Sequence, residues 1–154
     1  MGTRRRREEL IGGDRRGNRR YFLTEIPRLA AKKRPPSWPH GELFDHVAIS
    51  DEVVRCDIGE GVPLDDVEID VAVFSLSLMG ANSGDYLREA ARTLVFDGRL
   101  IICEASSRLP ADDDIQKRLE RLGFHITDIS RDAQFTFIQA IRTDREPETD
   151  VSLV

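Results

Sequence analysis

The stretch from Asp70 to Gly80, D-V-A-V-F-S-L-S-L-M-G, constrains the fold more than any other part of the chain. It is apolar or small after its leading acid, and its valines and phenylalanine favour a strand. A short run without charge is typical of a strand buried on both faces of a parallel sheet. Residues 84–95 follow with apolar side chains at helical spacing, and a second apolar run lies at 98–106. The order strand, helix, strand predicts a right-handed crossover around a central strand.

Shorter apolar runs on both sides of this unit predict the other elements. We expect further strands at 19–26, 42–45, 52–58, 124–130 and 134–142, and an amphipathic helix at 112–122. Asp112 to Asp114 are expected to cap that helix and complement its dipole, and Gly123 to end it. The last two strands are expected to pair antiparallel at a sheet edge. The pattern predicts an α/β domain with a mainly parallel sheet.

Composition narrows the class of protein. A chain of 154 residues with 40% hydrophobic and 33% charged residues suits one ordinary domain. No apolar stretch reaches the roughly 20 residues that a membrane span needs, and no apolar core follows the charged N-terminus as in a secretory signal. We therefore expect no membrane association and a cytoplasmic location. The oligomeric state is not predicted.

The cysteines and histidines do not predict a metal site. Cys56 and Cys103 are far apart in the sequence and fall in expected strands, which favours reduced thiols over a disulfide framework. The three histidines show no metal-ligand spacing among themselves or with the cysteines: His40, His46 and His125. No bound metal is expected.

Charge is distributed unevenly along the chain. Residues 1–34 hold twelve Lys and Arg against four acids, a charge of +8, so the remainder carries −13 of the net −5. We expect an Arg-rich and partly disordered arm at 1–34, a domain at 35–142 and a polar tail at 143–154. Such an arm can bind RNA phosphates without reading sequence. It can equally be a solvated tail, or upstream codons read as a start.

Several expected strands end in a polar residue. Ligands of open α/β sheets bind outside the carboxyl ends of the strands, where an acid can accept hydrogen bonds from ribose hydroxyls. Asp45 is the candidate for that role. Asp57 could accept from an adenine amino group while Ile58 packs on the ring, and Ser75 would face the same crevice. The alternative is that both aspartates cap turns, as aspartate commonly does.

A family resemblance is carried by four segments and two shorter ones. The segments are L-F-D-H-V-A (43–48), V-V-R-C-D-I-G-E-G-V-P-L (53–64), D-V-A-V-F-S-L-S-L-M-G-A-N (70–82), Y-L-R-E-A-A-R-T-L-V-F-D-G-R-L-I-I-C-E-A-S-S-R (86–108), L-G-F (122–124) and F-T-F-I-Q-A-I (135–141). They resemble the ribosomal RNA-processing protein 8 family over roughly residues 43–142. That family comprises class I S-adenosylmethionine-dependent methyltransferases acting on an adenine of large-subunit ribosomal RNA. The resemblance implies a Rossmann-like sheet with helices on both faces, and a nucleolar location in a eukaryote.

The resemblance also implies roles for particular residues. Asp45 would hold the ribose of S-adenosylmethionine, Asp57 and Ile58 would contact its adenine, and Ser75 would lie beside the donor where the family commonly has Cys. Residues 76–82 would border the target base, with substrate contacts expected from Leu78, Met79, Gly80 and Asn82. No catalytic acid or base is expected, because methyl transfer to a ring nitrogen depends mainly on positioning the two reactants.

The chain departs from the family at the start of the sheet. The family's first strand ends in a glycine-rich turn, D-x-G-C-G, whereas the corresponding residues 21–30 here, Y-F-L-T-E-I-P-R-L-A, contain no glycine. Side chains would then stand where the donor needs bare backbone. The first strand is accordingly expected to be degenerate or missing. Three functions stay open: an rRNA adenine methyltransferase, an inactive or truncated methyltransferase-like domain that binds RNA, and an incomplete gene product without stable function.

Overall fold

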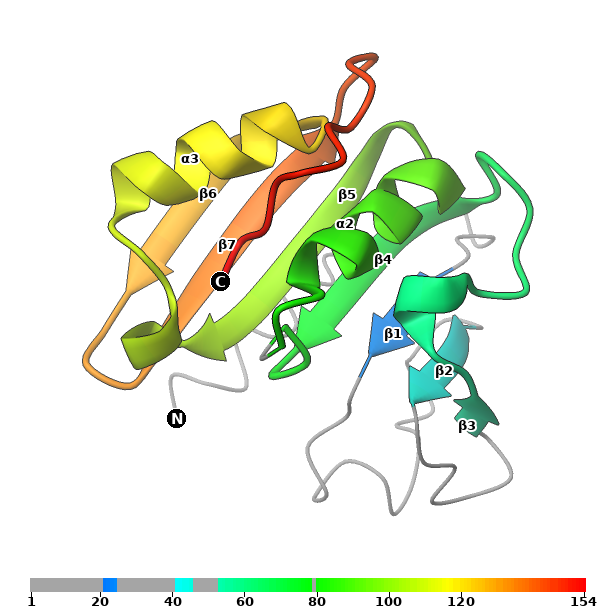
Figure 1. Cartoon of the computed structure of the whole chain (residues 1–154), viewed down its shortest axis with the longest axis horizontal. Coiled ribbons are helices and arrows are strands. Elements are labelled where there is room, and N and C mark those ends of the chain that lie inside the picture. The colour runs from blue at the N-terminus through cyan, green and yellow to red at the C-terminus, as the bar shows by residue number, and fades with distance from the viewer. Residues whose placement is uncertain (1–20, 25–40, 46–52, 79) are drawn as a thin grey trace, which may run out of the picture.

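The computed structural model describes residues 21–24, 41–45, 53–78 and 80–154, with side chains described from residue 54 onward. Its strands form one sheet of seven in the order β3-β2-β1-β4-β5-β7-β6 (Figure 1). The strands are β1 (Tyr21–Thr24), β2 (Gly41–Asp45), β3 (Val53–Arg55), β4 (Ile69–Ser75), β5 (Leu94–Ala105), β6 (Phe124–Arg131) and β7 (Phe135–Arg142).

Strand β4 is the centre of the sheet, as the apolar run at 70–80 predicts. It pairs in parallel with β1 on one side and with β5 on the other. Strand β7 pairs antiparallel with β5, and β6 antiparallel with β7, which confirms the expected antiparallel edge. Every residue of β4 is buried or half-buried, which agrees with its single charge, Asp70.

The first strand is present. Strand β1 is four residues long and pairs in parallel with β2 and β4 over its whole length. This confirms the strand expected at 19–26, in a shorter form. Of the two expectations for the first strand of the sheet, degenerate or missing, the second is wrong, because Y-F-L-T supplies enough strand-forming residues to be paired on both sides. The turn that would follow it, residues 25–30, lies outside the described residues.

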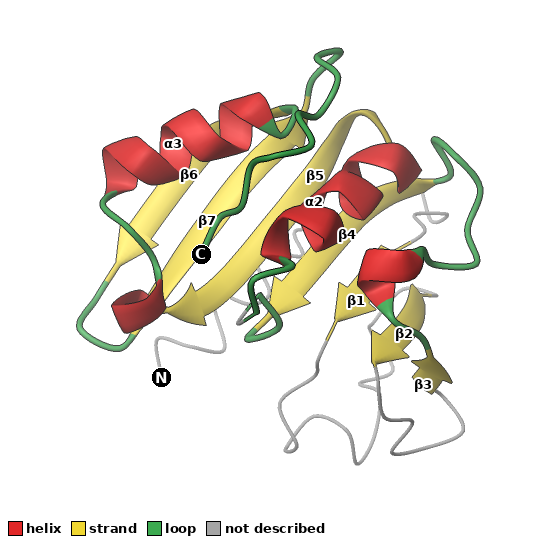
Figure 2. Ribbon diagram, viewed as in Figure 1, coloured by secondary structure: helices red, strands yellow, loops and turns green. Residues whose placement is uncertain are grey.

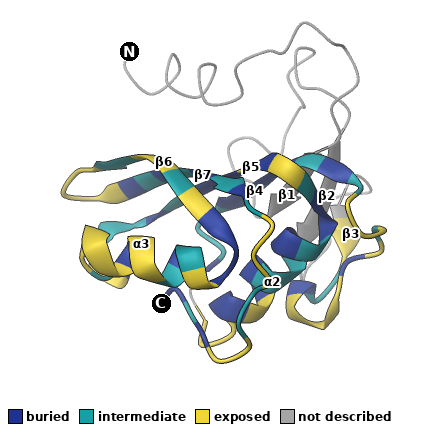
Figure 3. Ribbon diagram, turned by 90° about the horizontal axis from the view of Figure 1, so that it is seen from above, coloured by how far each residue is buried: buried dark blue, intermediate teal, exposed yellow. Residues whose placement is uncertain are grey.

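Two helices cover one face of the sheet. They are α2 (Ser83–Thr93) and α3 (Asp112–Arg121), and both lie on the same side of the strands (Figures 2 and 3). The residue before α3, Ala111, occupies the N-cap without a side-chain hydrogen bond, so the expectation that the aspartates cap this helix is wrong. They occupy its first turn, where carboxylates complement the dipole. The expectation of helices on the opposite face as well concerns residues that lie outside the described ones.

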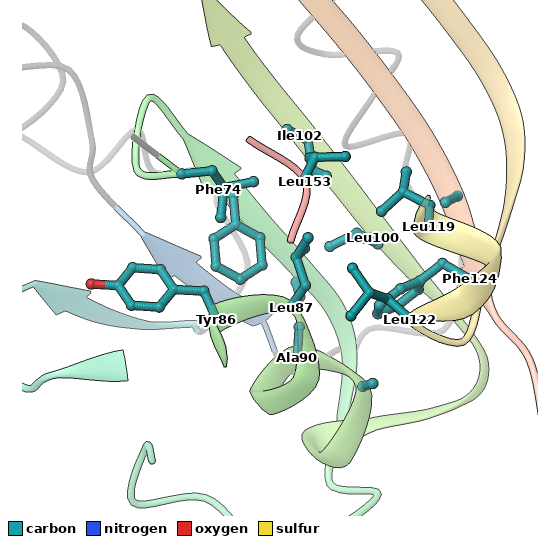
Figure 4. Packing of buried hydrophobic residues seen from close by; sticks show 14 of the residues in the cluster. Phe74, Tyr86, Leu87, Ala90, Leu100, Ile102, Leu119, Leu122, Phe124 and Leu153 are labelled. Atoms are coloured by element: carbon teal, nitrogen blue, oxygen red, sulfur yellow. The ribbon is translucent and has the colours of Figure 1, made fainter. Parts of the chain in front are cut away.

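The main hydrophobic core lies between these helices and strands β4, β5 and β7. Phe74 and Ile102 point from the sheet toward Leu87 of α2 and Leu119 of α3, and all four are fully buried (Figure 4). Alternation along the strands produces this face, since residues two apart share one side of a sheet. Helix α3 ends at Arg121, and Gly123, just after the C-cap residue Leu122, has a φ of 88°, the left-handed conformation that glycine adopts without strain.

The C-terminal segment belongs to this core. It runs between α2 and α3 over the same face of the sheet (Figure 1), and Leu153 is fully buried within the cluster (Figure 4). Val151 is 4% exposed. The expectation of a polar tail is therefore wrong for these two residues. Their spacing of two in an extended segment turns both toward the helices and the sheet.

Candidate functional site

The carboxyl ends of β1, β2 and β4 meet at one edge of the sheet. Thr24 pairs with both Phe44 and Phe74, so Asp45 and Ser75 occupy matching positions with one strand between them. Two strand spacings separate their backbones by roughly 10 Å. The register therefore brings these two predicted site residues to the same edge, on either side of β1.

Asp57 lies at the same edge, two residues beyond the end of β3. The strand expected at 52–58 ends at Arg55, and Asp57 caps the short 3-10 helix η1 (Ile58–Glu60). Its Oδ1 accepts a hydrogen bond of 3.0 Å from the backbone N–H of Gly59. The structure thus contains the turn cap that was the alternative interpretation of this aspartate. Its contact with an adenine stays a prediction, as does the packing of Ile58, which is 2% exposed and belongs to the core.

An ion-pair cluster fixes the segment that follows η1 to helix α2. The Glu89 carboxylate accepts a hydrogen bond of 2.7 Å from the backbone N–H of Val62 and pairs with Arg92 at 2.5 Å. Arg92 also pairs with Asp66 at 2.6 Å. These carboxylates raise the pKa of Arg92 above its ordinary value, mainly through the hydrogen bonds that Arg92 donates to Glu89. The loop between β3 and β4 is therefore tied to a helix on the core side of the sheet.

The expected substrate segment, residues 76–82, follows β4 directly. Leu76 has a φ of 56°, uncommon for a branched side chain, and its N–H donates to the Cys103 carbonyl at 2.8 Å. Gly80 and Asn82 are exposed, and a Cβ at Gly80 would lie 2.5 Å from the Asn82 Oδ1. Asn82 is itself exposed, so its side chain can rotate away from such a Cβ, and this approach alone does not require glycine at position 80. Met79 lies outside the described residues.

Leu78 does not present its side chain to a ligand. It is fully buried in the core cluster. The expectation of a side-chain contact between Leu78 and the substrate is therefore corrected to a packing role. The apolar side chain anchors the segment inward, and the exposed backbone and side chains of 80–82 are left at the surface.

Sequence reasoning assigned no role to Glu104, which lies at the carboxyl end of β5. Its side chain is fully buried, and its two oxygens accept hydrogen bonds from two backbone N–H groups, Leu78 at 3.2 Å and Ala105 at 2.9 Å. The Arg108 guanidinium lies 3.8 Å from the carboxylate. The signal in the sequence is the single charge within the apolar run L-I-I-C-E-A. A buried acid is rare unless it is paired.

The described part of the chain contains no cluster of three or more His, Cys, Asp or Glu residues that could hold a metal ion. Cys56 and Cys103 are free thiols, and burial, helped by the nearby acid Asp57, raises the pKa of Cys56 above its ordinary value. None of the described helices combines the length and the apolar character that a bilayer crossing demands.

Comparison with known proteins identifies the family. A family model described as a hypothetical methyltransferase matches residues 27–152. The chain belongs to this methyltransferase family. Rat ribosomal RNA-processing protein 8 is 41% identical over 99 residues, which are 64% of this chain and 21% of the rat protein. The 25S rRNA (adenine(645)-N(1))-methyltransferase of Schizosaccharomyces pombe is 40% identical over 62% of this chain and 31% of its own length. The chain thus spans about a fifth to a third of these relatives.

A solved structure confirms the fold. The 1,6-didemethyltoxoflavin-N1-methyltransferase of Burkholderia thailandensis superposes with a TM-score of 0.64 and 18% identity, over 89% of this chain and 75% of its own. At that identity the likeness concerns the fold alone. Together with the strand order around β4, it confirms the Rossmann-like class I methyltransferase sheet that the sequence predicts. The curated relatives confirm the resemblance to the ribosomal RNA-processing protein 8 family.

Proposed function

We propose that this chain is the donor-binding and base-binding domain of an S-adenosylmethionine-dependent methyltransferase that N-methylates an adenine in ribosomal RNA. The observation that carries the proposal is the 40% identity to a fission yeast protein named as an rRNA adenine N1-methyltransferase. It is supported by the shared sheet edge at which Asp45 and Ser75 occupy matching positions. S-adenosylmethionine is the proposed cofactor, and the solved neighbour contains its product, S-adenosylhomocysteine.

In this proposal some strand ends bind S-adenosylmethionine and others border the target adenine. Asp45 accepts hydrogen bonds from the donor ribose, Asp57 and Ile58 border the donor adenine, and Ser75 lies beside the donor. The exposed part of the substrate segment, with Gly80 and Asn82, borders the target base. Carboxylates suit the first role because charged acceptors form stronger hydrogen bonds with hydroxyls than neutral ones do.

The chemistry requires little of the protein beyond positioning. The lone pair of an adenine ring nitrogen attacks the methyl carbon while the carbon–sulfur bond breaks, and S-adenosylhomocysteine leaves as a neutral thioether. The positive charge moves from the sulfonium to the methylated base, so no acid or base has to transfer a proton in this step. Holding donor and acceptor in line supplies most of the acceleration.

The composition of the N-terminal residues favours a second function, RNA binding without methyl transfer. Residues 21–30 contain no glycine, whereas residues 1–34 carry a charge of +8. A domain that has lost the donor turn but kept a basic arm would act as an RNA-binding module. Its RNA affinity would fall steeply with salt, because it would come from neutralised phosphates. Its place in the cell, cytoplasm or nucleolus, stays a prediction for either function.

Calorimetric titration with S-adenosylmethionine separates the two functions. The methyltransferase binds the donor at micromolar concentrations, and Asp45→Ala weakens that binding about tenfold or more, which corresponds to about 1.4 kcal/mol. Asp128→Ala is the matched control, because Asp128 is exposed on the edge strand β6 and should leave the affinity unchanged. Absent or millimolar binding by the wild-type chain would refute the enzyme. RNA binding that is lost on deleting residues 1–20 would then support the module.

A further inference from the structure

We propose that Glu104 is a positioning residue that holds the substrate segment, residues 76–82, in the conformation in which it borders the target base. The inference rests on the proposed methyltransferase function for its catalytic consequence. Its structural part, the anchoring of the segment by a buried carboxylate, depends on the fold alone. None of the roles transferred from the family resemblance involves this residue.

The Glu104 carboxylate accepts hydrogen bonds from two parts of the chain. Glu104 is 0% exposed, yet both of its oxygens are used: Oε2 accepts from the Leu78 N–H and Oε1 accepts from the Ala105 N–H. The two donors belong to different strand ends, and Leu78 lies 26 residues before Glu104 in the sequence. The carboxylate therefore joins the chain after β4 to the end of β5. Charge-assisted hydrogen bonds of this kind are about twice as strong as neutral ones.

The substrate segment leaves the sheet after Leu76, and none of the described strands pairs with it beyond that residue. The parallel ladder between β4 and β5 continues as far as the Leu76 N–H, where the backbone turns into its left-handed conformation. From there the chain leaves the sheet, and the Leu78 N–H would lack a partner in the core without Glu104. A buried N–H group without an acceptor is costly, because it has lost its hydrogen bonds to water. The carboxylate thus stabilises a turn whose φ of 56° is unfavourable for leucine.

The two hydrogen bonds at position 104 require glutamate and not glutamine. Both groups facing the side chain are N–H donors, so the position requires two acceptors. Glutamine has only one acceptor oxygen, and its NH₂ group would face one of the two backbone donors. The Arg108 guanidinium, 3.8 Å away and 43% exposed, partly balances the buried charge from the solvent side. The arrangement therefore selects a carboxylate.

The exposed residues 80–82 lie between two anchored positions. The segment is held at its start by Glu104 and at its end by Ser83, whose N–H donates to the Gly80 carbonyl at 3.2 Å. Ser83 Oγ in turn accepts from the Leu153 N–H at 3.2 Å in the C-terminal segment. Residues 80–82 are exposed between these two anchors. Loosening one anchor should misplace them without removing any group that touches the donor.

The test compares Glu104→Gln and Glu104→Ala with Arg142→Met in the full chain. Arg142 is a matched control because it is also buried and charged, and it donates to backbone carbonyls, including Ala91 and Gly123, at the opposite edge of the sheet. Amide hydrogen exchange of Leu78 reports the anchor. Methyl transfer from S-adenosylmethionine to a large-subunit rRNA transcript, with donor affinity measured by calorimetry, reports the consequence. Urea denaturation shows whether each variant is folded.

We expect both Glu104 variants to raise the Leu78 exchange rate about tenfold or more and to lower kcat by a similar factor, with donor affinity within twofold of wild type. Arg142→Met should lower global stability without either local effect. Unchanged exchange at Leu78 in folded Glu104→Gln would overturn the anchor, and faster exchange with unchanged kcat would overturn the positioning role. If the wild-type chain transfers no methyl group, the proposed function and this positioning role both fail, and Leu78 exchange still decides on the anchor.

Discussion

The two halves of the sheet are built differently. Strands β1, β2 and β3 are three to five residues long, whereas β4 to β7 are seven to twelve. The long strands carry helices α2 and α3 and the C-terminal segment on one face. The short strands bring Asp45 to the edge at which Ser75 ends β4. We infer that the long half, β4 to β7, supplies most of the stability. The short half, β1 to β3, places residues where the proposed function needs them to bind S-adenosylmethionine.

The largest expected effect comes from the middle of the long half. Phe74→Ala removes a ring that is 0% exposed between the sheet and α2, and we expect it to lower the free energy of unfolding by about 3–5 kcal/mol. Val54→Thr in β3 is the comparison, because this side chain is 41% exposed and its change should cost less than about 0.5 kcal/mol. Urea denaturation measures both. Similar losses in the two variants would contradict the division of stability between the halves.

The next effect tests whether the C-terminal segment is part of the long half. Leu153→Ala removes a fully buried side chain, which should cost about 2–4 kcal/mol. Val67→Ala is a suitable control, since Val67 is 49% exposed in the loop before β4. Thermal denaturation followed by circular dichroism would compare the two variants. A Leu153→Ala variant as stable as the control would show that residues 143–154 add nothing to the core.

The long half could largely be predicted from the sequence, and its C-terminal segment could not. The runs around Phe74 and Ile102, and the helical spacing of α2 and α3, carry periodicities that depend only on neighbouring residues. Val151 and Leu153 stand in a polar stretch too short for a period. Their burial depends on packing against helices that lie far away in the sequence. Local patterns contain no such information.

The candidate site divides in the same way. A parallel sheet necessarily brings the carboxyl ends of its strands to one edge. The placement of Asp45 and Ser75 at the same edge therefore follows from the strands alone. Whether an end residue faces a ligand or its own turn does not follow from them. Asp57 caps η1, and Leu78 turns into the core. The hydrogen-bond donors to Glu104 are two backbone N–H groups, which no residue type reveals.

The smallest effect is a pH dependence at the end of the long half. Glu148 in the C-terminal segment accepts hydrogen bonds from Arg121 of α3 at 2.7 Å and from Arg145 at 2.6 Å. These contacts, chiefly the one from Arg121, lower the pKa of Glu148 below its ordinary value of 4.5. Because the folded form holds its proton less tightly than the unfolded form, the stabilisation is complete above the ordinary pKa. It is lost as the pH falls through the lowered one.

Glu148→Gln should therefore reduce stability slightly at neutral pH and flatten the decline of stability on acidification below about pH 4.5. Glu146→Gln on the same segment is the control, because Glu146 is an exposed acid two residues away. Urea denaturation at a series of pH values, repeated at high salt, measures the difference between the two variants. Because exposed ion pairs are weakened by salt, that difference should shrink as salt is added. Identical pH profiles would mean that the core contacts of Val151 and Leu153, and not this ion pair, hold the segment in place.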